Sequence, residues 1–331
     1  MVNGNIFEAI ASPTSEPLFP IRQNEKWGYI DKSGRMVISP QYDGTSGFSE
    51  GLAAIAVKSK WGFIDRTNRP VIPPQFDVAW SFSRGLSAVK LNGKWGFIDT
   101  TGNAIIPRQF VFAWSFGANL ASVGIKSESD SIKMGYIDKT GQFVILPDFD
   151  SASEFREGLA AVRVDRQMGY INGRGERVVP PQFDLTWRFS EGLAMVVADG
   201  KIGYIDKTGK IAIAPRFDFA WDFSGNLAPF KIGKNWGYID KTGTSKFSRN
   251  FSETKSFSEK LASVKIGEKW GYIDTKGEMK IPPQFDGAAA FENGLAAVRL
   301  GADWGYIDRR GEWVWFPYKY SDRSGLNCLF L

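Results

Sequence analysis

The sequence predicts an all-β protein built as a tandem array of nine three-stranded units, each of about 34 residues. The motif KWGYIDKTG, or a close variant, occurs nine times, and its glycine recurs every 34 residues except for one step of 39. Aromatic residues make up 15% of the chain, and these favour strands together with the abundant β-branched residues. An Asp-x-x-Gly turn signal follows the motif in most units. The repeated glycines are Gly28, Gly62, Gly96, Gly135, Gly169, Gly203, Gly237, Gly271 and Gly305.

The unit at residues 85–118 shows the expected strands most clearly. Leu86 to Leu91 predicts a first strand, and Asn92-Gly93 is a two-residue hairpin signal that leads into a second strand at Trp95 to Asp99. A short third strand is expected at Ala104 to Ile106, halted by Pro107. The aromatic remainder of the unit predicts a connector with a short helical turn.

The repeats extend almost from end to end. We expect a leader at residues 1–16 and one repeat array at residues 17–331, whose first unit is complete because Leu18 to Arg22 precedes Trp27 at the spacing of the later units. Gly325 to Leu331 matches the first strand of the ninth unit and predicts a terminal strand that caps the array.

Two architectures fit this pattern. An open β-solenoid or superhelix is favoured, because its unit number is free and its ends need caps. The alternative is a closed β-propeller-like ring, whose blades usually have four strands and about 40 or more residues, and which typically has four to eight blades.

The repeated WG-aromatic-Ile-Asp core, followed by PPQFD and EGLA signatures, resembles the WG-repeat (KWG repeat) family of mostly bacterial proteins across residues 17–331. The resemblance implies β-structured interaction modules and no common enzymatic activity. The chain departs from the pattern at Met134, Met168 and Ile202 in the Trp slot, and at Asn172 and Asn68 in the turn. Met and Ile keep the slot apolar, and Asn tolerates the left-handed conformation, so the expected fold is unchanged.

Composition argues against several functional classes. The net charge of +5 comes from 41 basic and 36 acidic residues without a basic stripe, so nucleic-acid binding is not expected. The chain has no histidine and a single cysteine, Cys328, and we expect no metal site, no cofactor and no catalytic residue. Neither a signal peptide nor a membrane-spanning apolar stretch is evident, which predicts a cytoplasmic protein.

Comparison of the nine units assigns roles to the repeated slots. The Trp of the motif can be replaced by Met or Ile, which predicts a core position. The following glycine is expected to allow close packing against the neighbouring unit. The recurring Asp is expected to accept backbone hydrogen bonds within its turn, not to bind calcium.

A second Trp slot lies in the connector and also accepts Ser, Lys and Ala, so its tryptophans are expected to be partly exposed. Exposed aromatic residues are typical of binding sites. The alternative is a structural role only, in which these tryptophans fill local gaps in the packing between particular neighbouring residues. The candidate binding residues are Trp80, Trp114, Trp187 and Trp221, with Arg84, Arg108, Arg188 and Arg216 expected at the rims of two aromatic patches.

These features predict a noncatalytic scaffold that binds a protein partner. Glycan or cell-envelope binding through the exposed tryptophans is the alternative. An enzyme would need a carboxylate pair, and Glu154 with Glu157 is better explained as charged connector residues. End-to-end self-association through the terminal strand is a further alternative.

Overall fold

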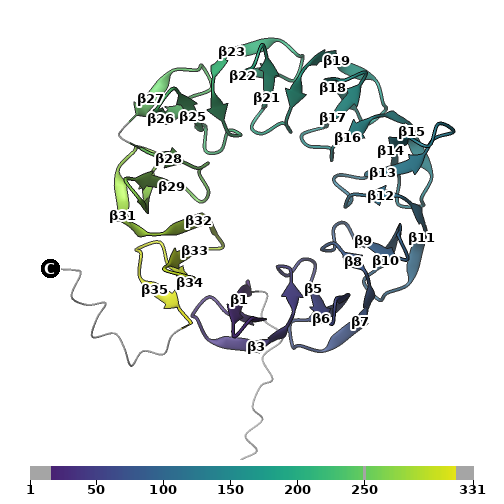
Figure 1. Cartoon of the computed structure of the whole chain (residues 1–331), viewed down its shortest axis with the longest axis horizontal. Coiled ribbons are helices and arrows are strands. Elements are labelled where there is room, and N and C mark those ends of the chain that lie inside the picture. The colour runs from purple at the N-terminus through teal and green to yellow at the C-terminus, as the bar shows by residue number, and fades with distance from the viewer. Residues whose placement is uncertain (1–15, 249–250, 318–331) are drawn as a thin grey trace, which may run out of the picture.

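The computed structural model describes residues 16–248 and 251–317, which form nine antiparallel sheets arranged in a closed ring (Figure 1). Within each sheet the strands are adjacent in chain order, and we call each sheet a blade. Blade 1 has three strands among the described residues and blades 2 to 9 have four. The prediction of an open solenoid was therefore wrong, and the closed alternative is correct: the protein is a nine-bladed β-propeller.

The strands of each blade succeed one another from the centre of the ring to its rim (Figure 1). The innermost strands are β4 (Gly44–Thr45), β8 (Val78–Ala79), β12 (Phe112–Ala113), β16 (Ser151–Ala152), β20 (Leu185–Thr186), β24 (Phe219–Ala220), β28 (Glu253–Thr254) and β32 (Gly287–Glu292). The second strands are β1 (Phe19–Gln23), β5 (Leu52–Val57), β9 (Leu86–Leu91), β13 (Ala121–Lys126), β17 (Leu159–Val164), β21 (Leu193–Ala198), β25 (Ala228–Ile232), β29 (Leu261–Ile266) and β33 (Leu295–Leu300).

The motif itself forms the third strands and the rim forms the fourth. The third strands are β2 (Lys26–Ile30), β6 (Lys60–Asp65), β10 (Lys94–Asp99), β14 (Ile132–Ile137), β18 (Gln167–Asn172), β22 (Lys201–Asp206), β26 (Asn235–Ile239), β30 (Lys269–Asp274) and β34 (Asp303–Ile307). The rim strands are β3 (Met36–Tyr42), β7 (Pro70–Phe76), β11 (Ala104–Phe110), β15 (Phe143–Phe149), β19 (Arg177–Phe183), β23 (Ile211–Phe217), β27 (Ser245–Ser248), β31 (Met279–Phe285) and β35 (Trp313–Trp315).

The three-stranded unit was an incomplete prediction, because the connector supplies a fourth strand. Its first residues pair with the second strand of the following blade, as Val78 and Ala79 do with Lys90 and Val89. The expected helical turn is absent, since the described residues contain strands, turns and bends only. No helix in this part of the chain could span a membrane.

The rim strand continues past the proline that was expected to end it. In blade 3, Pro107 lies inside β11. The register shifts between Trp95, which pairs with Phe110, and Phe97, which pairs with Ile106, so the proline falls in a bulge of an edge strand. Such a position needs no ladder hydrogen bond from the proline nitrogen.

The bulged rim strand crosses directly over the glycine of the motif. A Cβ atom on Gly62 would lie 2.4 Å from the carbonyl oxygen of Ile72 and 2.6 Å from the nitrogen of Pro74. Glycine is therefore needed for the close approach of backbone within one blade. The prediction that it packs against the neighbouring unit was wrong in this respect.

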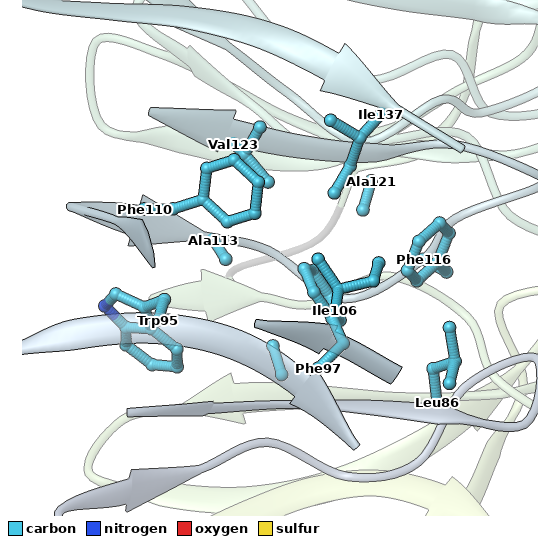
Figure 2. Packing of buried hydrophobic residues seen from close by; sticks show 11 residues of the cluster. Leu86, Trp95, Phe97, Ile106, Phe110, Ala113, Phe116, Ala121, Val123 and Ile137 are labelled. Carbon is cyan, nitrogen blue, oxygen red and sulfur yellow. The ribbon is translucent and has the colours of Figure 1, made fainter. Parts of the chain in front are cut away.

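The hydrophobic core is divided into nine clusters, each lying between two successive blades. Figure 2 shows the cluster between blades 3 and 4, where Phe97 and Ile106 of one blade meet Val123 and Ile137 of the next. Phe116 of the intervening connector packs against Phe97 with ring centroids 5.0 Å apart. Each sheet thus buries both of its faces, which is how a small four-stranded sheet obtains a core.

The ninth cluster closes the ring. Phe19, Ile21 and Ile30 of blade 1 pack with Leu295 of blade 9. The hydroxyl of Tyr306 donates a hydrogen bond of 2.9 Å to the carbonyl oxygen of Pro20. Closure depends on these contacts between residues nearly the full chain apart, which the spacing of the repeats does not reveal.

Two aspartate positions organise the polar contacts. The turn aspartates behave as predicted: Asp99 accepts hydrogen bonds of 2.9 Å from the backbone amides of Thr101 and Asn103. A second aspartate, after the rim strand, bridges two blades. Asp77 pairs with Lys60 of its own blade at 2.6 Å and accepts the Asn92 amide of the next blade at 2.9 Å.

The predicted terminal strand at Gly325 to Leu331 lies outside the described residues, as do residues 1–15 of the predicted leader. The alternative of end-to-end association, which rests on that terminal strand, therefore stays a prediction.

Replacing the motif glycine should destabilise the ring. We expect Gly62→Ala to lower the free energy of unfolding by about 1–3 kcal/mol, because the rim backbone must move away from the new methyl group. Gly47→Ala is the control, since no atom lies within 4 Å of its Cβ position, and it should change stability by no more than about 0.5 kcal/mol. Unfolding in guanidinium measures the stability of both variants. Equal unfolding midpoints would show that the rim strand crossing over Gly62 does not restrict the residue at this position.

Acid should unfold the protein through its turn aspartates. A hydrogen bond from the Thr140 hydroxyl, with smaller contributions from backbone amides, holds the pKa of Asp138 below its usual value of 3.8. A lowered folded-state pKa stabilises the fold above the unfolded-state pKa of about 3.9, and this contribution is lost as pH falls through the folded value. Asp138→Asn should therefore flatten the decline of the unfolding midpoint between pH 4 and pH 2.

Asn172→Asp is the reverse variant, because Asn172 already accepts the same two amide bonds without a charge. It should steepen the acid dependence. Parallel pH profiles for wild type and both variants would show that these turns do not control acid stability.

Candidate functional site

The backbone holds each candidate tryptophan at the inner edge of its blade. Each indole-bearing residue directly follows a two-residue inner strand, and its amide donates a hydrogen bond to the neighbouring second strand. The bonds run from Trp80 to Ala88 O at 3.0 Å, Trp114 to Ser122 O at 2.9 Å, Trp187 to Met195 O at 3.1 Å and Trp221 to Pro229 O at 3.1 Å. The four positions are therefore equivalent, and the prediction of partial exposure is confirmed at 38–44%.

Four aromatic rings of blades 3 and 4 form one continuous group, which we call the aromatic cluster: Trp80, Trp95, Phe112 and Trp114. Trp80 stacks on Trp95 with centroids 6.1 Å apart and on Trp114 at 5.9 Å. Phe112 completes the circuit, at 5.1 Å from Trp114 and 6.3 Å from Trp95. Trp95 is buried and the other two indoles are partly exposed, so one side of the cluster lies in the core and the other side faces solvent.

The second predicted patch is less compact. Trp221 packs against Phe219 at 5.1 Å, and Phe219 packs against Trp236 at 5.6 Å. No ring contact of Trp187 is found among the described residues. Blades 6 and 7 are linked beside these tryptophans by an ion pair of 3.1 Å between Arg188 and Asp222.

The four arginines do not gather around the tryptophans. Arg84 donates from Nε to the carbonyl oxygen of Gly117 at 3.3 Å, which ties one connector to the next. Arg108 and Arg216 lie on rim strands, at the opposite edge of the sheet from the tryptophans. Arg216 donates to the Gly243 carbonyl of the next blade at 2.7 Å. Only Arg188 lies next to a candidate tryptophan in the connector.

Sequence reasoning missed two members of the aromatic cluster. Phe112 occupies a slot two residues before the connector tryptophan, where other units carry residues as different as Ser151 and Glu253. That variability could have identified it. Trp95 was assigned to the core, correctly, but it also supports Trp80. Trp304, by contrast, is 49% exposed, and Gly287 and Ala289 stand in the places of Val78 and Trp80.

The turn aspartates and the aspartates that bridge two blades are hydrogen-bonded within the fold. The side-chain bond from Lys60 lowers the pKa of Asp77, and the Thr208 hydroxyl does the same for Asp206. Such carboxylates are ionised at neutral pH and already hydrogen-bonded. Within residues 16–248 and 251–317, no three acidic, cysteine or histidine side chains come together to hold a metal ion.

Comparison with solved structures supports the architecture. The structure described as "Crystal structure of the eukaryotic initiation factor" aligns with a TM-score of 0.65 at 10% identity, over 92% of this chain and 96% of that chain. "KlHsv2 with loop 6CD replaced by a Gly-Ser linker" aligns at 0.40 and 10% identity, over 69% and 87%. "AfRom2 CNH domain" aligns at 0.35 and 10% identity, over 72% and 93%. At this identity the first likeness concerns the fold alone.

No curated protein matches the sequence. The family described as WG containing repeat does match, in eight consecutive segments: residues 27–61, 61–95, 95–126, 134–166, 168–201, 202–236, 236–270 and 270–302. These segments cover most of the chain, each beginning in the Trp slot that precedes the crossed glycine. The protein therefore belongs to the WG-repeat family.

Proposed function

We propose that the protein is a noncatalytic scaffold that binds a protein partner through the aromatic cluster of blades 3 and 4. The observation that carries this proposal is the circuit of four rings, in which Trp80 and Trp114 remain 38% exposed. Tryptophans held rigidly at a surface can bind an apolar side chain at little cost in conformational entropy. The backbone hydrogen bonds of both residues provide this rigidity.

The absence of an evident catalytic group supports a binding role. The chain contains no histidine, and the turn carboxylates are saturated with hydrogen bonds, as at Asp99. A general acid or base needs a titratable group that is free to exchange its proton with a substrate.

Glycan binding is the less favoured function of the same surface. Sugars stack on a free indole face, whereas Trp80 already stacks on two other indoles. Trp187 is the better candidate for a sugar, because it is equally exposed and makes no ring contact among the described residues.

The proposal predicts that Trp80→Ala/Trp114→Ala weakens partner binding by about 2 kcal/mol or more, roughly 30-fold. Trp304→Ala is the matched control, since Trp304 is the more exposed residue at 49% and lies outside the aromatic cluster. Partners captured from native lysate by wild type should be lost with the double variant and kept with the control. Circular dichroism must show all three proteins folded, and equal capture by all three would overturn the proposal.

The glycan alternative has its own measurement. Wild type and Trp187→Ala are applied to a glycan array. If the cluster is a protein-binding surface, neither protein retains a glycan. A glycan retained by wild type and lost with Trp187→Ala would replace the protein-binding proposal with the alternative.

A further inference from the structure

A cavity of about 540 Å³ lies where the last blade meets the first. It is bordered by β1, by the connector of blade 9 at Ala289 and Asn293, and by the connector of blade 2 at Gly47 and Phe48. We use connector for the seven residues that run from the inner strand to the turn before the second strand, such as Gly44–Glu50. The cavity therefore occupies the position between two connectors, where the connector of blade 1 belongs.

At the other eight junctions this position is filled by a connector phenylalanine. Its ring packs on the tyrosine or phenylalanine that follows the motif glycine of the preceding blade, with centroids 4.7–5.0 Å apart. The pairs are Tyr29–Phe48, Phe63–Phe82, Phe97–Phe116, Tyr136–Phe155, Tyr170–Phe189, Tyr204–Phe223, Tyr238–Phe257 and Tyr272–Phe291. Tyr306 of blade 9 has no such connector partner among the described residues and contacts Phe19 instead, at 5.5 Å.

Residues 10–16, IASPTSE, have the pattern of a connector. They precede Leu18 by the same spacing at which residues 44–50, GTSGFSE, precede Leu52. Ala11 falls in a slot that holds only Ala or Thr in the eight described connectors. Ser15 and Glu16 fall in the slots of Ser49 and Glu50, whose side chains bond to the next connector: Ser49 to Phe82 O at 2.7 Å, and Glu50 to the Arg84 amide at 2.7 Å.

One slot of this segment departs from the pattern, and the departure is compensated. Thr14 stands where every described connector has phenylalanine. Phe19, in turn, stands where the other eight blades have Ala or Ser, each no more than 1% exposed. The aromatic ring that a connector supplies in the other blades comes here from Phe19 of β1, which contacts Tyr306.

An arginine with an unsatisfied donor atom faces the same cavity, and its guanidinium lies 5.5 Å from the ring centroid of Phe48. Arg66 lines the cavity, and the Nη2 atom of Arg66 is buried without a hydrogen-bond partner among the described residues. In three other blades, the cation in this turn slot pairs with a connector glutamate fifty residues earlier. These pairs are Lys207–Glu157 at 3.0 Å, Lys241–Glu191 at 3.3 Å and Arg309–Glu259 at 3.5 Å. At the same spacing, the glutamate that corresponds to Arg66 is Glu16. Among the described residues Glu16 is exposed and makes no ion pair with Arg66.

We propose that residues 10–16 bind in this cavity as the ninth connector, with Ala11 pairing with β1 as an inner strand and Glu16 forming an ion pair with Arg66. Blade 1 is then four-stranded like the others. This inference is independent of the proposed function.

The aromatic compensation gives the sharpest test. Phe19→Ala should lower the melting temperature, because it empties the space beside Tyr306. Thr14→Phe/Phe19→Ala should recover about half or more of that loss by restoring the arrangement of the other blades. Ser12→Phe/Phe19→Ala is the matched control and should recover none, since that slot carries exposed residues such as Trp80 elsewhere.

Hydrogen exchange tests the segment in the unmodified chain. The backbone amides of residues 10–15 other than Pro13 should exchange about tenfold or more slowly than in a free peptide of the same sequence. Arg66→Gln should remove that protection, whereas Glu191→Gln, which breaks the observed pair with Lys241, should leave it intact.

Three results would overturn the proposal. The first is that residues 10–15 of the wild type exchange as fast as in the free peptide and that Thr14→Phe does not restore the melting temperature of Phe19→Ala. The second is protection of residues 318–324 in their place, which would assign the cavity to the carboxyl-terminal segment. The third is rescue or protection found only in a dimer on size-exclusion chromatography, which would make a second copy the donor.

Discussion

The structure depends on the passage of each rim strand over the glycine of the WG pair. In seven of the nine blades, the three atoms nearest to the missing Cβ of this glycine are all backbone atoms of the rim strand, at 3.0 Å or less, as at Gly62 and Gly169. The residue after the glycine is consequently fixed. In Tyr204 and Tyr238 the ring is at most 1% exposed, and the hydroxyl donates to a carbonyl of the next connector at 2.8 Å. One close backbone contact therefore positions the side chain that joins one blade to the next.

The connectors explain how a unit of 34 residues can build a propeller. Each connector gives its first residues to the inner edge of one sheet and its phenylalanine to the core that this sheet shares with the preceding one. Where a connector carries serine and glutamate, these side chains bond to the following connector, as Ser190 does to Phe223 O at 2.7 Å and Glu191 to the Gly225 amide at 2.7 Å. A segment that contacts three blades replaces the longer strands and loops of larger blades.

Local structure could be predicted from the sequence, and the assembly of the units could not. Leu86–Leu91 and the Asp99 turn were placed correctly because apolar patterning and turn chemistry are properties of neighbouring residues. Closure of the ring was not predicted, since it depends on contacts such as that between Phe19 and Tyr306, nearly the full chain apart. The same applies to the candidate site. Exposure of the connector tryptophans followed from the variability of their slot, whereas the contact between Trp80 and Trp114 and the rim position of Arg108 required the register of the sheets.

Closure of the ring also changes how the molecule can come apart. In a linear repeat array, the terminal unit contacts one neighbour and frays easily, so that stability declines toward the ends. Here the first and last blades share a core of their own, built from Ile21, Ile30 and Leu295. For the first or last blade to separate, it must lose its contacts at that seam and also those with its other neighbour. Two interfaces are therefore broken instead of one. Fraying is therefore suppressed, and the nine sheets are expected to unfold more cooperatively than a linear array of the same units.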